Sequence, residues 1–236
     1  MIKRRMIQGL LILALLCGAV LLAHPSAAWA DVTATKPAQV DGVYQIGSAE
    51  ELYGFAELVN DGETNANAVL TRDITINSNV LDEDGALNGD GSDFIQWTPI
   101  GNGSKPYVGT FDGQGRTISG LTIDSNARYA GLFGRIDYNG TVKNLTLADS
   151  YINSHINGGS GIFVYVGGIC GHNLGTITTC SNNGTVTGVA ASNNVYVGGI
   201  CGWNLGTITT CSNSSTVTGT YVGGICGWNN GGSGVK

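Results

Sequence analysis

Acidic side chains are absent from the C-terminal part of this 236-residue chain. From Ser150 onward there is no Asp or Glu, and the only Lys or Arg is Lys236. General acid–base catalysis and metal binding depend mostly on carboxylates, His or Lys. If the protein is an enzyme, most of its catalytic site must therefore lie between Asp31 and Asp149.

Basic side chains are also few, and three of the 11 Lys and Arg lie at the start of the chain. Lys3–Arg5 precede an apolar run from Leu10 to Ala23, and the small–large–small sequence Ala28–Ala30 follows. This order is typical of a signal peptide, so we expect residues 1–30 to be removed by cleavage near Ala30. The apolar run is short for a membrane span, which needs about 20 residues. The sequence thus predicts a secreted or cell-surface protein with no membrane span in the mature chain; a retained N-terminal anchor is the weaker alternative.

The mature chain would be strongly acidic. It would carry eight Lys and Arg against 17 Asp and Glu, a net charge of −9. Nucleic-acid binding normally needs a basic surface. The composition therefore predicts no nucleic-acid partner, and it equally disfavours electrostatic binding to anionic lipid.

A repeat dominates the second half of the chain. The 24 residues Tyr165–Gly188 return at Tyr196–Gly219 with only three changes, at Trp203, Ser214 and Ser215. A third copy begins at Tyr221 and breaks off, so further repeats or domains are expected if the chain is a fragment. Such a period is typical of repeat architectures, in which each unit buries its apolar face against its neighbours. Stacked units more often form an extended surface than a single catalytic pocket.

Each repeat contains three short β-prone runs, for example Val166–Gly171, Thr176–Cys180 and Thr185–Thr187, separated by turns rich in Asn and Gly. This pattern predicts an all-β solenoid, a parallel β-helix whose rungs stack about 4.8 Å apart. A β-sandwich also has many short strands, but it would not explain identical residues at matched positions. We expect the β-helix domain to cover residues 43–236, with regular repeats at 165–229.

One helix is expected in the mature chain, at residues 48–60. Ser48 and Glu51 form a capping box, and Leu52, Phe55 and Val59 recur at helical spacing. This helix would cap the open edge of the first rung and protect it against aggregation. Before it, residues 31–42 are expected to form a flexible leader; after it, residues 81–94 are expected to form an acidic insertion.

Short motifs recur through most of the mature chain. They are Tyr44–Asn60, Trp97–Gly101, Gly109–Gly113, Thr117–Leu121, Ala130–Gly134, Val166–Gly171, Val197–Gly202 and Val222–Gly227. With these motifs the chain resembles the GLUG-motif repeat family of bacterial exported and surface proteins. The resemblance implies a right-handed parallel β-helix and a role similar to that of adhesins. Such repeats also occur beside catalytic domains in immunoglobulin-A-cleaving zinc peptidases, but the HExxH signature of those peptidases is absent here. The resemblance implies no catalytic residue.

Five cysteines of the mature chain occupy two repeat positions. One position holds Cys170, Cys201 and Cys226, and the other holds Cys180 and Cys211. The cysteines could form a disulfide within each rung, Cys170–Cys180 and Cys201–Cys211, as an exported protein permits. They could instead form two buried thiol ladders, with Cys acting as a small hydrophobic residue. The ladders are favoured because aligned residues stack in this fold, whereas a zinc site is disfavoured by the lack of CxxC pairs.

A further repeat position is always occupied by a residue with a ring in its side chain: His172, Trp203 and Trp228. A catalytic role for His172 is disfavoured, because the repeats contain no carboxylate to orient it. The three rings could form an exposed platform for the sugar rings of a glycan ligand. Ring-on-ring packing is the favoured alternative. The aligned residues Asn173, Asn204 and Asn229 are expected to form a ladder of stacked amides.

Thr176 and Thr178, with their equivalents Thr207 and Thr209, would form an array of outward hydroxyls. Flat Thr arrays on β-helices can bind ice. Thr is, however, common at exposed strand positions in general.

Carboxylates gather in the first half of the mature chain. Asp82, Asp84, Asp90 and Asp93 lie in a Gly-rich segment, and oxygen ligands of this kind suit calcium. The complete calcium-loop pattern is missing, so a solvated acidic loop is the favoured interpretation and no cofactor is required. A second set could supply a carboxylate pair for glycan cleavage, although these residues lie at predicted turns or strand ends. It consists of Asp112, Asp124, Asp137 and Asp149.

The sequence therefore predicts an exported, non-enzymatic β-helix repeat protein, an adhesion or binding module for an extracellular glycan or protein. The alternative is a β-helical polysaccharide-cleaving enzyme that uses carboxylates of residues 82–149. An enzyme would bring two carboxylates together in one groove, whereas a binding module would leave them dispersed.

Overall fold

The computed structural model describes residues 32–156, 162–190 and 194–230. The predicted signal peptide, with its cleavage site near Ala30, lies outside these ranges. The fold is mostly β, with one α-helix among the described residues. Its sheets are built almost entirely from parallel strand pairs, an arrangement consistent with a β-helix or solenoid.

The N-terminal part begins with a hairpin and the helix. Strands β1 (Ala38–Val40) and β2 (Val43–Ile46) pair antiparallel across Asp41 and Gly42, whose φ angles are 50° and 78°. A two-residue turn with two positive φ angles matches the twist of a hairpin. Residues 38–40, expected to belong to a flexible leader, are therefore paired as a strand.

Helix α1 (Ala49–Asp61) lies where the capping box predicts a helix. The Ser48 side chain accepts a hydrogen bond from the Glu51 amide, but the Glu51 carboxylate returns to the Gly47 amide at 2.7 Å rather than to that of Ser48. The helix ends at Gly62, which has a φ of 133°. Phe55 packs its ring against Tyr44, Tyr107 and Phe111 at 5.8–6.2 Å, so the apolar face of α1 is held against the N-terminal core.

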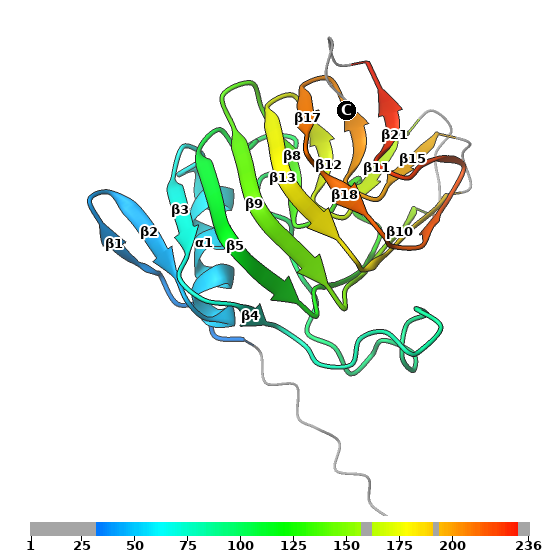
Figure 1. The fold of residues 1–236 in the computed structure, drawn as a ribbon, viewed down its shortest axis with the longest axis horizontal. Coiled ribbons are helices and arrows are strands. Elements are labelled where there is room, and N and C mark those ends of the chain that lie inside the picture. Colours follow the sequence, from blue (N-terminus) through cyan, green and yellow to red (C-terminus); the bar gives the residue numbers. More distant parts are fainter. Residues whose placement is uncertain (1–31, 157–161, 191–193, 231–236) are drawn as a thin grey trace, which may run out of the picture. The chain divides into compact units, whose positions relative to one another are not determined.

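The chain then runs through successive rungs (Figure 1). The first strands after α1 are β3 (Asn67–Leu70), β4 (Ile74–Thr75), β5 (Thr110–Ser119) and β6 (Thr122–Ser125). A full rung follows, with β7 (Tyr129–Ala130), β8 (Phe133–Ile136), β9 (Thr141–Ala148) and β10 (Tyr151–Ile156). The next has β11 (Val164–Gly167), β12 (Cys170–Asn173), β13 (Thr176–Asn182) and β14 (Thr185–Ala190). The last described strands are β15 (Val195–Gly198), β16 (Cys201–Asn204), β17 (Thr207–Thr209), β18 (Ser212–Asn213), β19 (Val217–Thr218), β20 (Tyr221–Gly223) and β21 (Cys226–Asn229).

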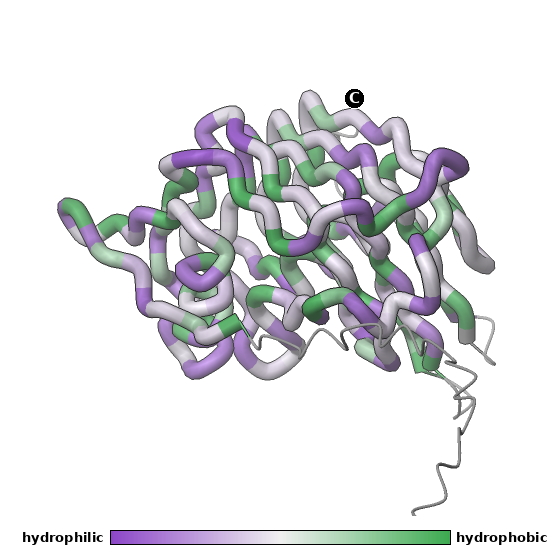
Figure 2. Tube along the Cα trace, turned by 90° about the horizontal axis from the view of Figure 1, so that it is seen from below, coloured by the Kyte–Doolittle hydropathy of each residue, from purple (hydrophilic) through white to green (hydrophobic). Residues whose placement is uncertain are grey.

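Equivalent strands of successive rungs pair in register. One sheet, named here the long sheet, has the order β1-β2-β3-β5-β9-β13-β17, and β4 and β18 pair with β5 and β13. The other three sheets have the orders β19-β14-β10-β6, β20-β15-β11-β7 and β21-β16-β12-β8. Ile177 pairs with Ile208, and Tyr165 pairs with Tyr196, so repeat-equivalent residues are direct neighbours. Figure 2 shows how apolar and polar residues alternate along the strands.

Each regular rung has four strand positions rather than the expected three. The run Val166–Gly171 does not form one strand, because the chain bends at Gly168 between β11 and β12. A Cβ at Gly168 would collide with the carbonyl oxygen of Gly199 and lie 2.7 Å from the Asn182 side-chain amide. Two rungs approach closely at this bend, and only glycine leaves room for the contact.

Candidate functional site

Two columns of rings run side by side along the stack. The first contains one tyrosine per rung, with neighbouring ring centroids 4.9–6.0 Å apart: Tyr129, Tyr165, Tyr196 and Tyr221. The second contains the three predicted platform residues, His172, Trp203 and Trp228, which occupy register positions on β12, β16 and β21. The columns touch, because Tyr165 stacks on His172 at 5.3 Å and Tyr196 meets the edge of Trp203 at 4.8 Å.

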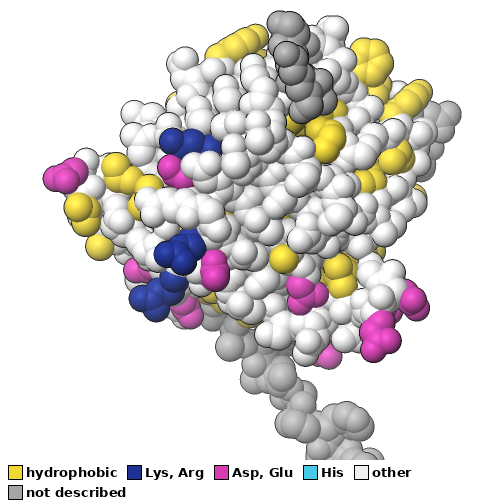
Figure 3. Space-filling model, in the orientation of Figure 1, with side chains coloured by type: hydrophobic (Ala, Val, Ile, Leu, Met, Phe, Trp, Pro, Cys, Tyr) yellow, Lys and Arg dark blue, Asp and Glu magenta, His cyan; other side chains and the backbone are white. Residues whose placement is uncertain are grey.

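These rings pack chiefly against each other. Trp203 and Trp228 stack at 5.1 Å with an interplanar angle of 17°, so they cover one another's faces. Tyr165 and Tyr196 are buried, whereas Trp228 and Tyr221 are 44% and 45% exposed. A sugar ring needs a free aromatic face. At Tyr165, Tyr196 and Trp203, away from the C-terminal end of the columns, the rings are therefore arranged for ring-on-ring packing. Figure 3 shows hydrophobic side chains gathered over the C-terminal rungs.

His172 has the properties of a packing residue. Burial, together with the positive charge of Arg135, lowers the pKa of its imidazole to about 4. Neither ring nitrogen has a hydrogen-bond partner among the described residues. The imidazole is therefore neutral at pH 7, and no carboxylate orients it as a general base would require.

The cysteines are aligned as thiol ladders. All five are free thiols in this structure. Cys170, Cys201 and Cys226 are register partners, and the neighbouring pairs Thr178–Thr209 and Ser181–Ser212 place Cys180 beside Cys211. A hydrogen bond from the Cys180 thiol lowers the pKa of Cys211 to about 7, while the same contact and burial raise the pKa of Cys180.

The asparagines form buried ladders. The side chain of Asn173 donates to that of Asn204 at 2.7 Å, and Asn204 donates to Asn229 at 2.8 Å. A parallel ladder joins Asn182 to Asn213 at 3.2 Å. Asn173, Asn182 and Asn204 are buried, and buried amides need such partners. These residues hold the rungs in register.

The acidic segment does not gather its carboxylates into a metal site. The Asp82 carboxylate accepts bonds from the amides of Asp84 and Ala86, and the Asp90 carboxylate accepts one from the Ser92 amide. Asp90 and Asp93 line one pocket of about 320 Å³, whereas Asp82 and Asp84 do not line it. Among the described residues, no three His, Cys, Asp or Glu side chains are grouped to hold a metal ion. Acidic side chains around this segment are visible in Figure 3.

Each carboxylate of the second acidic set has a structural partner of its own. Asp124 accepts from Asn153 at 2.8 Å, Asp137 pairs with Arg135 at 3.6 Å, and Asp149 accepts from the Leu81 amide at 2.9 Å. These partners come from different parts of the fold.

Asp112 is similarly engaged. It accepts a side-chain bond from Asn144 at 3.0 Å and pairs with Lys143 at 3.3 Å. Burial alone would raise the pKa of Asp112, but hydrogen bonds from Asn144 and Gln114 and the charge of Lys143 hold it below its usual value. A general acid needs the opposite shift.

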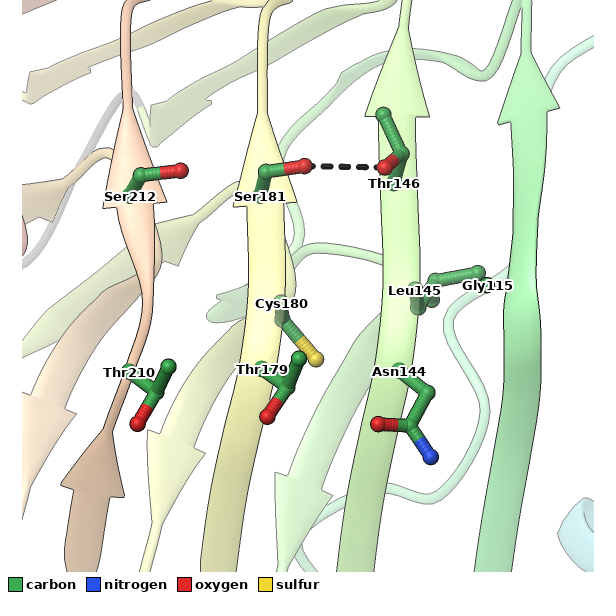
Figure 4. A pocket seen from close by; sticks show the side chains of 9 residues that line it. All are labelled: Gly115, Asn144, Leu145, Thr146, Thr179, Cys180, Ser181, Thr210 and Ser212. Carbon is green, nitrogen blue, oxygen red and sulfur yellow. Dashed lines mark hydrogen bonds between the residues drawn. The ribbon is translucent and has the colours of Figure 1, made fainter.

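A groove that the sequence analysis missed crosses the outer face of the long sheet. It has a volume of about 390 Å³ and is named here the hydroxyl groove. Figure 4 shows its residues as two rows with Leu145 and Cys180 between them. One row holds Asn144, Thr179 and Thr210, the other holds Thr146, Ser181 and Ser212, and Gly115 lies beside Leu145.

A break in strand alternation forms this groove. Ile177 and Cys180 are both buried although they are three residues apart, so the chain between them contains one extra residue. Thr179 absorbs the irregularity with a φ of 53°, as Asn144 and Thr210 do on neighbouring rungs, each with a φ of 54°. The spacing of the apolar residues in Thr176–Cys180 is the signal that could have revealed the bend.

Comparisons with known proteins bear out the family resemblance. The GLUG motif matches residues 164–187 and 193–218. The chain is 40% identical over 103 residues to halomucin from Haloquadratum walsbyi, covering 42% of this chain and 1% of halomucin. It is also 37% identical over 86 residues to a candidate Gly-rich membrane protein from Evansella cellulosilytica, covering 36% of this chain and 9% of that protein. The chain thus spans a small fraction of the length of these relatives.

A solved structure shares the fold. It is that of a candidate immunoglobulin A1 protease from Bacteroides ovatus, with a TM-score of 0.54 and 21% sequence identity. The match covers 84% of this chain and 66% of that one. At this identity the likeness concerns the fold alone. No helix in the described part of the chain has the length and apolar character needed to cross a membrane.

Proposed function

We propose that this chain, which carries two GLUG motifs, is an exported surface or secreted module that binds an extracellular ligand in adhesion and catalyses no reaction. The observation that carries the proposal is the outward face of the long sheet. There the same side chain recurs in register on four successive strands, at Thr110, Thr141, Thr176 and Thr207. A surface that repeats itself in this way suits an extended ligand better than one reacting bond.

The names of the relatives support the location. One is a halomucin and the other a candidate Gly-rich membrane protein. The signal-peptide pattern of residues 1–30 points to the same compartment. Cleavage near Ala30 would release a mature chain for the cell surface or the medium.

The carboxylates support a non-enzymatic role. Asp112, Asp124, Asp137 and Asp149 each bind a different neighbour, which fits dispersed structural acids better than a paired acid and base. The proposal also requires no cofactor, calcium included. Ligand binding should therefore survive exhaustive chelation.

The proposal includes a right-handed coil capped by α1. Parallel strand–connection–strand units are right-handed in nearly all known sheets. The cap is supported by the packing of Phe55 of α1 on Tyr44 of β2 and on Phe111 of β5, which would let the helix shield the N-terminal end of the core. Covering an open end in this way suppresses edge-to-edge aggregation.

The test is a binding screen with a parallel assay for turnover. The full chain is labelled and applied to arrays of glycans and extracellular proteins, with and without EDTA, and every bound polysaccharide is incubated with the protein and examined for cleavage products. We expect saturable binding, unchanged by EDTA, without products. Polysaccharide cleavage that is lost in Asp112→Asn or Asp124→Asn would establish the enzyme instead, and absence of binding to both arrays would refute the module.

A further inference from the structure

The hydroxyl groove contains polar groups that the fold leaves unused. Within the part of the chain that the structure describes, the side-chain hydroxyls of Thr179, Thr210 and Ser212 make no hydrogen bond. Nearby hydroxyls on the same sheet are paired: Thr209 donates to Thr178 at 3.0 Å, and Thr146 and Ser181 lie 2.9 Å apart. The groove thus offers free donors and acceptors on two successive rungs.

Two of these groups occupy strained positions. Thr179 and Thr210 have left-handed φ angles of 53° and 54°, a conformation that is uncommon for a β-branched residue. The equivalent position on the preceding strand holds Asn144, a residue type that tolerates this conformation, and the bulge of β5 opposite it holds Gln114 and Gly115, both also left-handed. The hydroxyls of Thr179 and Thr210 make no hydrogen bond within the described part of the chain that would offset this strain. Strained side chains that the fold does not need are typical of binding sites.

The chemistry of the lining selects the ligand. None of the described residues that line the groove is charged. On the same sheet, the charges of Asp112 and Lys143 are paired with each other at 3.3 Å. Leu145 and Cys180 lie buried beneath the groove, between the two polar rows (Figure 4). A neutral chain rich in hydroxyls matches this lining, since it needs hydrogen bonds and no charged partner.

A peptide fits less well. Extended peptides usually add to the open edge of a sheet, where their backbone finds unpaired amides and carbonyls. The groove lies across the face of the long sheet, between strands that already pair with each other. Its available groups are side-chain hydroxyls, which repeat once per rung, about 4.8 Å apart.

We propose that the hydroxyl groove binds an extended, neutral polysaccharide that runs along the stack and bonds to Thr179 and Thr210 on successive rungs. This inference rests on the proposed function and names the ligand class and the site. The two threonines offer equivalent hydroxyls to successive units of the polymer.

The experiment compares three double variants of the full chain. Thr179→Gly/Thr210→Gly removes both hydroxyls and suits the left-handed backbone. Thr179→Ser/Thr210→Ser keeps both hydroxyls. Thr187→Ala/Thr218→Ala, a matched control, removes one Thr from each of the same two rungs but on β14 and β19. The probes are cellohexaose, xylohexaose, mannohexaose and laminarihexaose, with heparin and polygalacturonate as charged arms, all measured by calorimetry.

We expect the wild-type protein to bind at least one neutral hexasaccharide. The Gly variant should lose tenfold or more in affinity, since two hydrogen bonds are removed. The Ser variant and the control should bind within about threefold of wild type, a change smaller than the loss of one hydrogen bond. The Gly variant should unfold at a temperature close to that of the wild type, because glycine relieves the strain while gaining freedom in the unfolded chain.

Two results would overturn the inference while leaving the binding module intact. One is hexasaccharide binding that survives in the Gly variant. The other is an array partner that proves to be a protein or a charged polysaccharide while all four neutral hexasaccharides fail to bind. The proposed function fails separately, when neither the arrays nor the hexasaccharides bind the wild-type chain.

Discussion

Gly168 provides a direct test of how closely the rungs are stacked. Its position between β11 and β12 recurs at Gly199 and Gly224 in the next two rungs. A methyl group at Gly168 would collide with the carbonyl oxygen of Gly199 and lie 2.7 Å from the side-chain nitrogen of Asn182. The same addition at Gly224 meets nothing within 4 Å. Neither glycine has a left-handed φ, so the contrast is one of space alone.

The magnitude follows from two contributions. Forcing an extra methyl group into a closely packed site costs about 1–3 kcal/mol. The collision also displaces the buried hydrogen bond from Asn182 to the Gly199 carbonyl, now 2.9 Å long, at a cost of about 1 kcal/mol. We expect Gly168→Ala to lower the free energy of unfolding by about 3 kcal/mol and the melting temperature by roughly 6–12 °C.

The assay is thermal and urea unfolding of Gly168→Ala and Gly224→Ala, followed by circular dichroism. Gly224→Ala should be neutral or more stable by up to about 1 kcal/mol, because alanine restricts the unfolded chain. Equal stability of the two variants would refute the stacking of the rungs at this bend.

Three further changes probe the ladders and the charges. Asn204→Ala should lower the free energy of unfolding in urea by about 3 kcal/mol, since it removes two ladder bonds and the bond to the Gly206 carbonyl, each worth about 1 kcal/mol. The exposed control Asn183→Ala should change it by less than about 0.5 kcal/mol, and equal effects would contradict a buried ladder. Alkylation of Cys211 by iodoacetamide should accelerate as the pH rises through about 7, where its thiolate forms. Cys180→Ala should move this transition to higher pH, because it removes the hydrogen bond that lowers the pKa of Cys211. A pH profile unchanged by Cys180→Ala would show that the two thiols do not interact. Because the pKa of Asp112 is lower in the folded protein than in the unfolded chain, its ionised carboxylate stabilises the fold at a pH above the unfolded pKa, and this contribution is lost as the pH falls through the folded pKa. Asp112→Asn should therefore destabilise the protein by up to about 1 kcal/mol at pH 7 and progressively less under acid conditions. A difference in stability that does not change with pH would contradict this assignment.

The repeat made the register predictable. Aligning the two copies places Ile177 against Ile208 and Cys170 against Cys201, and the structure pairs both. Such ladders follow from sequence because stacked rungs present identical residues at one level. The helix was predictable for a local reason, since the capping pattern at Ser48 and Glu51 is read without tertiary contacts.

The bends were not predictable from the conformational preferences of single residues. Gly168 divides one β-prone run into two strands because of a contact with Gly199, which lies 31 residues away in sequence. Thr179 adopts a left-handed φ although its residue type disfavours one. Residue preferences therefore miss the hydroxyl groove, which depends on where this irregularity falls in several rungs at once.

The aromatic columns show the same limit. Alignment placed His172, Trp203 and Trp228 together, and the tyrosines were recognisable as the start of each rung. The contact between the two columns joins residues on either side of the bend at Gly168, as in the stacking of Tyr165 on His172. Only the folded path of the chain reveals that the tyrosine column packs against the column of His172, Trp203 and Trp228.

The central claim is that equivalent residues of successive repeats are direct neighbours. A methyl–methyl NOESY spectrum of the full chain labelled at Ile and Val, assigned through single Ile→Val and Val→Ala substitutions, measures this directly. The account predicts strong cross-peaks between Ile177 and Ile208 and from Val197 to both Val166 and Val222, because neighbouring parallel strands lie about 4.8 Å apart. Cross-peaks confined to each repeat, with none between equivalent residues, would contradict it.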